Sequence, residues 1–157
     1  MDEIDHQILQ YLIANCRMPF TEIAKKILVS AGTIHIRVKK MEDLGIIKGS
    51  TLIIDYEKMG YTFIAYVGLV VSNSAFSPKI IDEIRNIPEV TVAHLTTGKF
   101  SVYCKIRAKN TKHAKNIIFK LSEIKGVERT ESSISLEEII NDKKRLMTDI
   151  FECLKET

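Results

Sequence analysis

The sequence has 157 residues, of which 45% are hydrophobic and 27% are charged, a composition typical of a globular protein with one domain or two small ones. No apolar run approaches the roughly 18 residues that a membrane span needs, and the acidic start Met1-Asp2-Glu3 predicts no secretory signal. We therefore expect a cytoplasmic protein without membrane partners, and three widely separated cysteines argue against a disulfide framework or a Cys-x-x-Cys site.

The net charge of +3 is too small to imply a nucleic-acid partner by itself. Its distribution is more informative, because residues 1–60 are neutral overall but contain a basic stretch. Between residues 25 and 48, six basic residues face only two acidic ones. A local basic patch within a neutral segment is compatible with binding to a polyanion.

The first sixty residues predict three short helices followed by an extended strand. Asp2 is placed to cap a helix that ends near Asn15, and Thr21 is placed to cap a second helix of two turns. Ser30 is placed to cap a third helix, which runs to about Leu44 and is ended by Gly45. Apolar residues at helical spacing predict the buried faces: Ile4, Ile8, Leu9, Leu12 and Ile13; Ile23, Ala24 and Ile27; Ile34, Val38 and Met41.

Two short helices joined by a turn, the second with a small, polar and basic outer face, are typical of a helix-turn-helix. The amino end of such a helix presents short polar side chains to base edges, and basic residues further along pair with phosphates. The alternative is a solvated helix that happens to be basic. We expect the following residues to bind DNA: Ser30, Gly32, Thr33, His35, Ile36, Arg37, Lys39, Lys40 and, from the extended segment 46–55, Lys48.

The turn before the third helix contains an unusual residue. One position in such a turn often adopts a positive φ and is therefore often glycine, but this sequence has Leu28-Val29 there. A branched side chain at a positive φ costs about 1 kcal/mol, so Leu28 counts against the helix-turn-helix interpretation.

The next part of the chain predicts a repeated strand and helix pattern. A strand spans residues 61–72, Ser77-Pro78 opens a helix, and strands at 90–96 and 100–107 flank the tight turn Thr97-Gly98-Lys99. Asn110 or Thr111 caps a second helix, and residues 127–136 form the last strand. This β-α-β-β-α-β order predicts a ferredoxin-like sheet with both helices on one face. The first strand alternates between two apolar faces, one with Phe63, Ala65, Val67, Leu69 and Val71 and the other with Ile64, Tyr66, Gly68 and Val70. The helices can cover only one face of the sheet, so the apolar residues on its other face need a partner, and a second copy of the domain is the simplest one.

The sequence resembles the Lrp/AsnC (leucine-responsive/asparagine-type) family of bacterial and archaeal transcription regulators. The resemblance covers residues 2 to about 138 and depends on the order and spacing of several short motifs. These are Asp2-Glu3-Ile4-Asp5, Ile8-Leu9, Arg17, Glu22-Ile23-Ala24, Ser30 with Thr33-Ile34, Arg37-Val38, Gly45-Ile46-Ile47-Lys48-Gly49, Asp55, Met59-Gly60 and Thr97-Gly98-Lys99-Phe100.

The resemblance implies dimers formed by the βαββαβ domain, further assembly of the dimers to an octamer, and effectors, often amino acids, bound between dimers beside the hairpin. On this basis we expect the effector-binding residues to be His94, Thr96, Thr97, Gly98, Phe100 and Ser101. Ser101 stands where many relatives have aspartate, which removes a natural partner for an ammonium group. We therefore hypothesise an effector other than a common free amino acid, or none.

The expected organisation is an α+β chain of three parts. Residues 1–60 form a winged-helix-like helix-turn-helix domain, residues 61–138 form the βαββαβ effector-binding and dimerisation domain, and residues 139–157 form a helical extension. That extension either packs on its own domain or adds to the oligomer interface. Its predicted apolar stripe consists of Ile139, Ile140, Leu146, Met147, Ile150 and Leu154.

Other sites are not supported by motifs. His6, His35, His94 and His113 are scattered without a second ligand at metal spacing, and no nucleotide-binding or hydrolase motif occurs. We expect no metal, no cofactor and no catalytic residue. The expected function is a sequence-selective, effector-modulated regulator of transcription on double-stranded DNA. The alternatives are a stand-alone small-molecule binding module or enzyme, and an architectural protein that coats DNA without reading its sequence.

Overall fold

The computed structural model describes residues 1–72, 78–142 and 144–153. The chain divides into two compact units. The helical unit consists of residues 1–53 together with the chain from Ile140 onward, and the sheet unit consists of Ile54–Ile139. No helix in the described ranges is both long and apolar enough to span a membrane.

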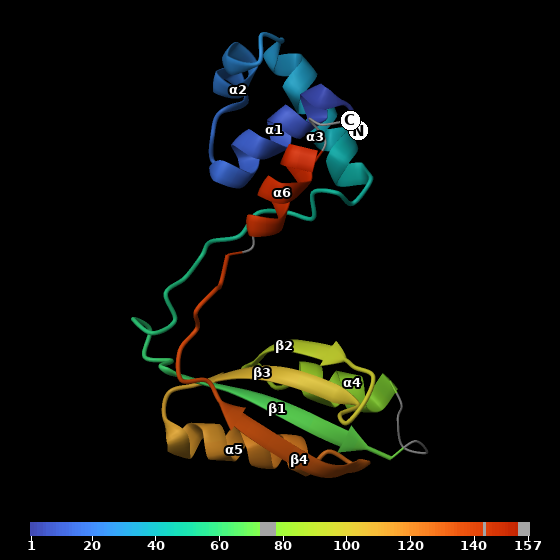
Figure 1. Cartoon of the computed structure of the whole chain (residues 1–157), viewed down its shortest axis with the longest axis vertical. Helices are drawn as coiled ribbons and strands as arrows, with labels where there is room; N and C mark the ends of the chain where they lie inside the picture. Colours follow the sequence, from blue (N-terminus) through green and yellow to red (C-terminus); the bar gives the residue numbers. More distant parts are fainter. Residues whose placement is uncertain (73–77, 143, 154–157) are drawn as a thin grey trace. The chain divides into compact units, whose positions relative to one another are not determined.

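The helical unit begins with three short helices, α1 (Glu3–Ala14), α2 (Phe20–Lys26) and α3 (Ala31–Asp43) (Figure 1). The caps predicted at Asp2 and Ser30 are confirmed, since each side chain accepts a hydrogen bond from the backbone N–H three residues later. The predicted Thr21 cap is wrong. Pro19 occupies the N-cap position without a side-chain hydrogen bond, and its φ of −60° and ψ of 138° lead directly into the helix.

The apolar stripes predicted for these helices form one core. Ile8, Ile23 and Ile34 are fully buried in it. A fourth helix, α6 (Arg145–Cys153), joins the same core through the buried Phe151 and the partly buried Met147. The stripe predicted for the extension is therefore wrong in part: its other members Ile139, Ile140, Leu146 and Ile150 are exposed, and Leu154 lies outside the described residues.

The two ends of α3 adopt the backbone conformations that a helix-turn-helix requires. Leu28 has a φ of 58°, so the turn before α3 forms despite the branched residue, and Gly45 ends α3 with a φ of 69°. The extended strand predicted over residues 46–55 is not formed. These residues are mostly exposed, and no strand in the described part of the chain pairs with their backbone.

The sheet unit has the predicted βαββαβ order (Figure 1): β1 (Phe63–Val71), α4 (Pro78–Arg85), β2 (Val90–Leu95), β3 (Val102–Ala108), α5 (Thr111–Ser122) and β4 (Val127–Ile134). The strands are antiparallel in the order β2-β3-β1-β4. Asn110 caps α5, as one of the two predicted alternatives requires, whereas Ser77, the cap predicted before α4, lies outside the described residues.

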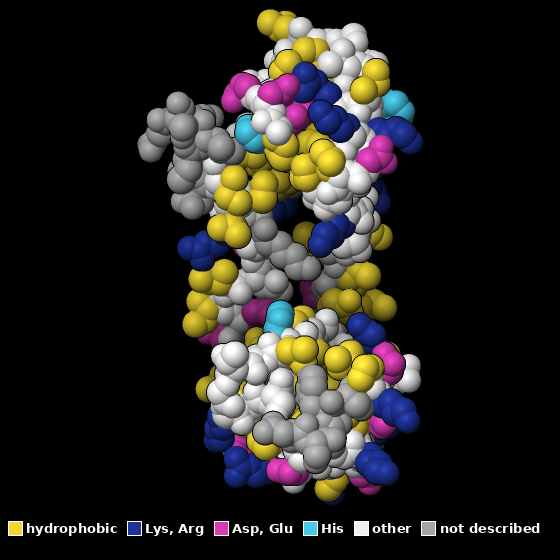
Figure 2. All heavy atoms as spheres, turned by 90° about the vertical axis from the view of Figure 1, so that its right-hand side faces the viewer, with side chains coloured by type: hydrophobic (Ala, Val, Ile, Leu, Met, Phe, Trp, Pro, Cys, Tyr) yellow, Lys and Arg dark blue, Asp and Glu magenta, His cyan; other side chains and the backbone are white. Residues whose placement is uncertain are grey.

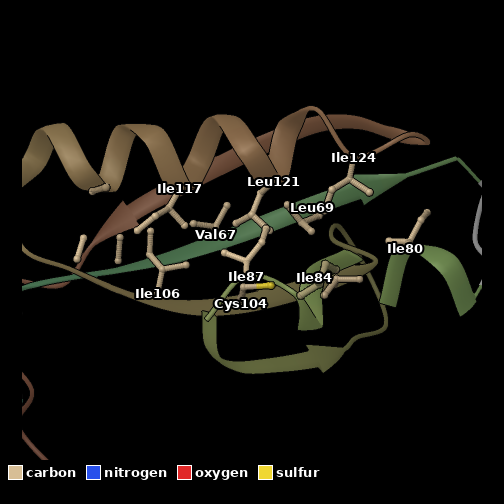
Figure 3. Close-up of a cluster of buried hydrophobic side chains, with 14 of the residues drawn as sticks. Val67, Leu69, Ile80, Ile84, Ile87, Cys104, Ile106, Ile117, Leu121 and Ile124 are labelled. Carbon is tan, nitrogen blue, oxygen red and sulfur yellow. The ribbon is translucent and has the colours of Figure 1, made fainter. Parts of the chain in front are cut away.

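One face of this sheet is covered by both helices. Val67 and Leu69 of β1 and Cys104 of β3 face Ile84 of α4 and Leu121 of α5 in a continuous buried core (Figure 3). The alternate residues of β1 and β3 lie on the opposite face, which we call the open face. This confirms the face assignment predicted from the period-2 pattern of the first strand.

Candidate nucleic-acid interface and ligand-binding domain

The helix α3 is amphipathic in the way that a recognition helix requires. Its inner stripe of Ile34, Val38 and Met41 is buried in the core of the helical unit, which fixes the helix rigidly. Its outer face is accessible. Five of the nine residues predicted to bind DNA are exposed on it: Gly32, His35, Ile36, Lys39 and Lys40. The last turn of α3 also exposes the acidic residues Glu42 and Asp43.

The amino end of α3 is organised by two hydroxyl groups. The Thr33 backbone N–H donates to Ser30 Oγ at 3.0 Å, and the two hydroxyl oxygens lie 2.8 Å apart in a second hydrogen bond. Both predicted residues therefore hold the start of the helix in place. The His35 ring lies 6.1 Å from the ring of Phe20, so α2 supports this side chain.

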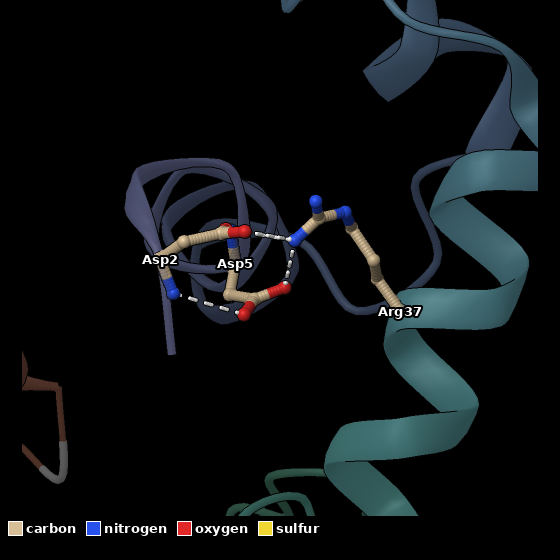
Figure 4. Close-up of polar contacts among 3 residues, drawn as sticks. All are labelled: Asp2, Asp5 and Arg37. Atoms are coloured by element: carbon tan, nitrogen blue, oxygen red, sulfur yellow. Dashed lines mark hydrogen bonds and ion pairs between the residues drawn. The ribbon is translucent and has the colours of Figure 1, made fainter.

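Arg37 has a structural role that the sequence prediction missed. Its guanidinium Nη1 donates to both carboxylate oxygens of Asp2 at 2.7 Å and to Oδ1 of Asp5 at 2.8 Å (Figure 4). Asp5 is buried and also accepts from the Asp2 backbone N–H at 3.1 Å. The phosphate contact predicted for Arg37 would compete with these bonds, which join α3 to the start of α1.

The same contacts shift the protonation of the groups involved. The hydrogen bond from Arg37 is the main reason why the pKa of Asp2 lies below its ordinary value of 3.8. The bonds to Asp2 and Asp5 likewise raise the pKa of Arg37, so the pair is fully charged at neutral pH.

Three predicted phosphate contacts remain available. Lys39, Lys40 and Lys48 are exposed, and among the described residues none of them forms an ion pair. Leu28, in the turn that precedes α3, is 92% exposed. The outer face of α3 therefore combines free cations with short polar and apolar side chains.

The predicted effector residues lie at or beside the β2–β3 hairpin, and several are bonded to one another. Thr96 Oγ1 donates to the Phe100 carbonyl at 2.6 Å, and the Thr96 N–H donates to the Ser101 carbonyl at 3.1 Å. Gly98 has a φ of 104°, which favours glycine in this turn. Thr97 and Gly98 are exposed at the turn itself.

Ser101 is bonded to the neighbouring strand. Its backbone N–H donates to the Leu69 carbonyl at 2.8 Å, and its hydroxyl accepts from the Val71 N–H at 3.2 Å. The Ser101 side chain thus completes the end of β1.

The open face of the sheet carries an aromatic cluster. Phe100 lies over Gly68, where an added Cβ would approach the ring to 2.5 Å, and it stacks on Tyr103 with 5.7 Å between ring centroids. Tyr103 in turn stacks on Tyr66 at 6.0 Å. The two tyrosines are not among the residues predicted to bind an effector, although their alternation with buried residues in β1 and β3 is the signal that places them together.

Polar and apolar side chains are mixed on the surface around these elements. Figure 2 shows hydrophobic side chains on the drawn face of the sheet unit, bordered by Lys and Arg side chains.

A cavity of about 500 Å³ is lined by α4 and β2 and includes Ile81, Arg85, Leu95 and the predicted effector residue His94. The hairpin residues from Thr96 to Ser101 do not line it, so His94 and the hairpin are separate features.

Metal binding has no visible site in the described part of the chain. No group of three or more His, Cys, Asp and Glu side chains there is placed to hold a metal ion. Burial raises the pKa of Cys104 to about 11, so this cysteine is a neutral core thiol at physiological pH.

Comparison with known proteins gives matches over both units. Residues 1–48 match a family model described as winged helix-turn-helix DNA-binding, and residues 64–144 match the Lrp/AsnC ligand binding domain. The "Regulatory protein AsnC" of Haemophilus influenzae is 35% identical over 146 residues, which cover 92% of this chain and 97% of that one.

Solved structures agree with these matches. The structure of Escherichia coli AsnC superimposes with a TM-score of 0.86 at 30% identity and covers 91% of this chain and 97% of its own. A transcriptional regulator of Neisseria meningitidis in complex with L-methionine has the same fold, with a TM-score of 0.84 at 22% identity, and the match covers 91% of this chain and 94% of that one.

Proposed function

Because the chain belongs to the Lrp/AsnC family of transcription regulators, we propose that it recognises particular double-stranded DNA sequences through α3. The combination of a winged helix-turn-helix domain and a ligand-binding domain makes it an effector-modulated DNA-binding regulator and not an enzyme. We place it in the cytoplasm together with its DNA.

The observation that carries the proposal is the division of α3 into two faces. The inner face is held rigidly by the core, and the outer face carries His35 and Ile36 together with Lys39 and Lys40, which form no ion pair with any described residue. His35 and Ile36 are assigned to base edges, and Lys39, Lys40 and Lys48 to phosphates. Ser30, Gly32 and Thr33 form the amino end of α3 that approaches the major groove. Arg37 orients α3 through its bonds to Asp2 and Asp5 at the start of α1.

The test is selection of bound sequences from a random duplex pool with the full chain. A regulator enriches particular sequences and loses affinity steeply with salt, whereas an architectural protein shows only the salt dependence and a metabolite-binding module shows neither. His35→Ala should relax the preference at one base position, while Lys39→Ala should weaken all duplexes alike. A pool without enrichment contradicts sequence-selective binding.

We further propose that the chain forms a homodimer through the open face of the sheet, and that dimers assemble to an octamer. The stacked rings of Phe100, Tyr103 and Tyr66 support the first step, because they are an aromatic surface that the unit's own helices do not cover. Two symmetric copies of α3 would then read half-sites about one helical turn apart.

Sedimentation of the full chain tests this assembly. Tyr103→Glu should convert the dimer to monomers, and Asn116→Glu on the exposed side of α5 is the matched control, because it also adds one negative charge. An unchanged mass for Tyr103→Glu would rule out the open face as the interface. Truncation at Asn141 tests whether the extension contributes to the oligomer.

The effector is proposed to bind at the hairpin of the sheet unit, with Thr96, Thr97, Gly98, Phe100 and Ser101 as its surroundings and His94 as a neighbouring contact. The Neisseria relative in complex with L-methionine makes amino acids the first class to test. Calorimetry with the twenty amino acids decides between this class and the hypothesis drawn from Ser101. Micromolar binding of any of them contradicts that hypothesis, and absence of binding supports it.

A further inference from the structure

The outer face of α3 contains a glycine, Gly32, at a position where nothing in the helical unit requires glycine. Gly32 lies in the first turn of α3, and its φ is not in the left-handed region. A Cβ added there would meet only Ser30 Oγ, at an ordinary van der Waals distance of 3.7 Å. Alanine would fit and is the better helix former, so the fold itself does not require glycine at this position.

A second residue on the same face is apolar without being buried. Ile36 is 69% exposed and contributes nothing to the core that its neighbours Ile34 and Val38 build. It is β-branched, which is less favourable in a helix than a straight side chain. Residues four apart in a helix lie on the same face one above the other, so Ile36 stands one turn beyond Gly32.

The surroundings of this pair indicate which kind of partner would cover it. Lys39 and Lys40 lie three and four residues after Ile36, one turn further along the helix, and are exposed without an ion pair among the described residues. Within α3 itself Ile36 is the only large apolar side chain that is exposed, and the exposed Leu28 and Leu44 lie beyond the two ends of the helix. One apolar side chain near cations on the helix face suits an isolated apolar group on a polyanion better than an extended apolar protein surface. In the major groove of DNA, the apolar group on the base edges is the C5-methyl of thymine.

We propose that Gly32 and Ile36 together read a thymine in the major groove. Ile36 packs against the C5-methyl group, and the missing side chain at Gly32 allows the DNA to approach the backbone of the first turn of α3. The inference rests on the proposed function of α3 and adds the base group that is read and the two residues that read it.

The test uses the full chain and the duplex obtained by selection, in which each thymine is replaced in turn by deoxyuridine. This replacement removes only the methyl group. At one thymine in each half-site, deoxyuridine should weaken binding by about fourfold, the value expected for one lost methyl contact. Ile36→Ala should bind the thymine and deoxyuridine duplexes equally, whereas Lys39→Ala should weaken both and keep the difference between them.

The Gly32→Ala variant distinguishes a lost DNA contact from a folding defect, because it is expected to lower the affinity for DNA without lowering the stability of the protein. The melting temperature should stay the same or rise, while affinity for the selected duplex should fall by roughly the fivefold or more that a lost base contact costs. Unaltered affinity in Gly32→Ala would overturn the close approach, and a thymine–deoxyuridine difference that survives in Ile36→Ala would overturn the methyl contact.

The outcomes also distinguish this inference from the function on which it rests. A protein that selects a preferred duplex but is insensitive to deoxyuridine at every position keeps the proposed function and loses the thymine contact. A protein that selects no duplex loses both.

Discussion

Replacing Arg37 by glutamine distinguishes a structural ion pair from a DNA contact. The change removes the charged donor 2.8 Å from Asp5, a carboxylate with only 6% of its surface exposed. A buried charged acceptor that loses its donor costs about 1–3 kcal/mol, and we take the middle of this range as the expected loss. For a domain of this size each 1 kcal/mol lowers the melting temperature by about 4–8 °C, so the helical unit should melt about 8–16 °C lower.

The measurement is thermal unfolding of the full chain, combined with hydrogen exchange to assign the change to a unit. Amides of α1 and α3 should lose protection in Arg37→Gln, and amides of β1 and β3 should keep theirs. The double variant Arg37→Gln with Asp5→Asn should be less destabilised than the sum of the single variants, because it no longer leaves a buried carboxylate without its cation.

DNA binding supplies the second measurement, below the melting transition. The logarithm of affinity against the logarithm of salt concentration should keep its slope in Arg37→Gln, because this guanidinium is not assigned to a phosphate. The matched control Lys39→Gln should reduce the slope by about one and change stability by less than about 0.5 kcal/mol. Normal stability with a reduced slope in Arg37→Gln would instead identify Arg37 as a phosphate contact without a structural role.

Three further predictions follow from the helical unit. Leu28→Gly should stabilise it by up to about 1 kcal/mol, measured by denaturant unfolding, because glycine adopts the φ of 58° without steric cost. Phe151→Ala should destabilise it by about 3 kcal/mol and leave exchange in the sheet unit unchanged, because Phe151 is buried in the core of the helical unit. Acid titration should show that the stability contributed by Asp2 is complete above its ordinary pKa of 3.8 and is lost as the pH falls below it, because its folded pKa is lowered.

Each of these has an outcome that contradicts it. A less stable Leu28→Gly variant would mean that the leucine side chain makes an interaction in the helical unit that outweighs its backbone cost. If Phe151→Ala lowered amide protection equally in both units, α6 would not stabilise the core of the helical unit alone. Asp2→Asn is the control for the titration, and an identical acid transition in this variant would remove Asp2 as the cause.

Much of the local structure was predictable from the sequence. Helical spacing identified the buried residues of α1, α2 and α3, and the alternation in residues 61–72 assigned the two faces of β1. Asp2, Ser30 and Asn110 cap their helices as predicted, because a cap depends on residues three positions apart. The cap predicted at Thr21 was wrong, because Pro19 is the N-cap residue of α2 and forms no side-chain hydrogen bond.

The candidate DNA-binding face was predictable for the same reason, whereas the partners of individual polar groups were not. The position of Arg37 on α3 follows from helical periodicity, but its pairing with Asp2 and Asp5 connects residues 35 and 32 positions apart. Ser101 is separated by 30 positions from the Val71 backbone to which its hydroxyl is bonded. Such pairings depend on how helices and strands are brought together, and short sequence windows carry no information about that.

The family, the helices and strands of both units, and the buried faces of α1, α2, α3 and β1 thus follow from the sequence, because they depend on local spacing and on the order of motifs; the strand expected over residues 46–55 does not form. The tertiary structure decided that α6 completes the core of the helical unit through Met147 and Phe151 instead of through Leu146 and Ile150. An amphipathic pattern shows that a face will be buried somewhere. The surface that buries it, and the exact side chains that fit there, are set by the shape of a core built from distant parts of the chain.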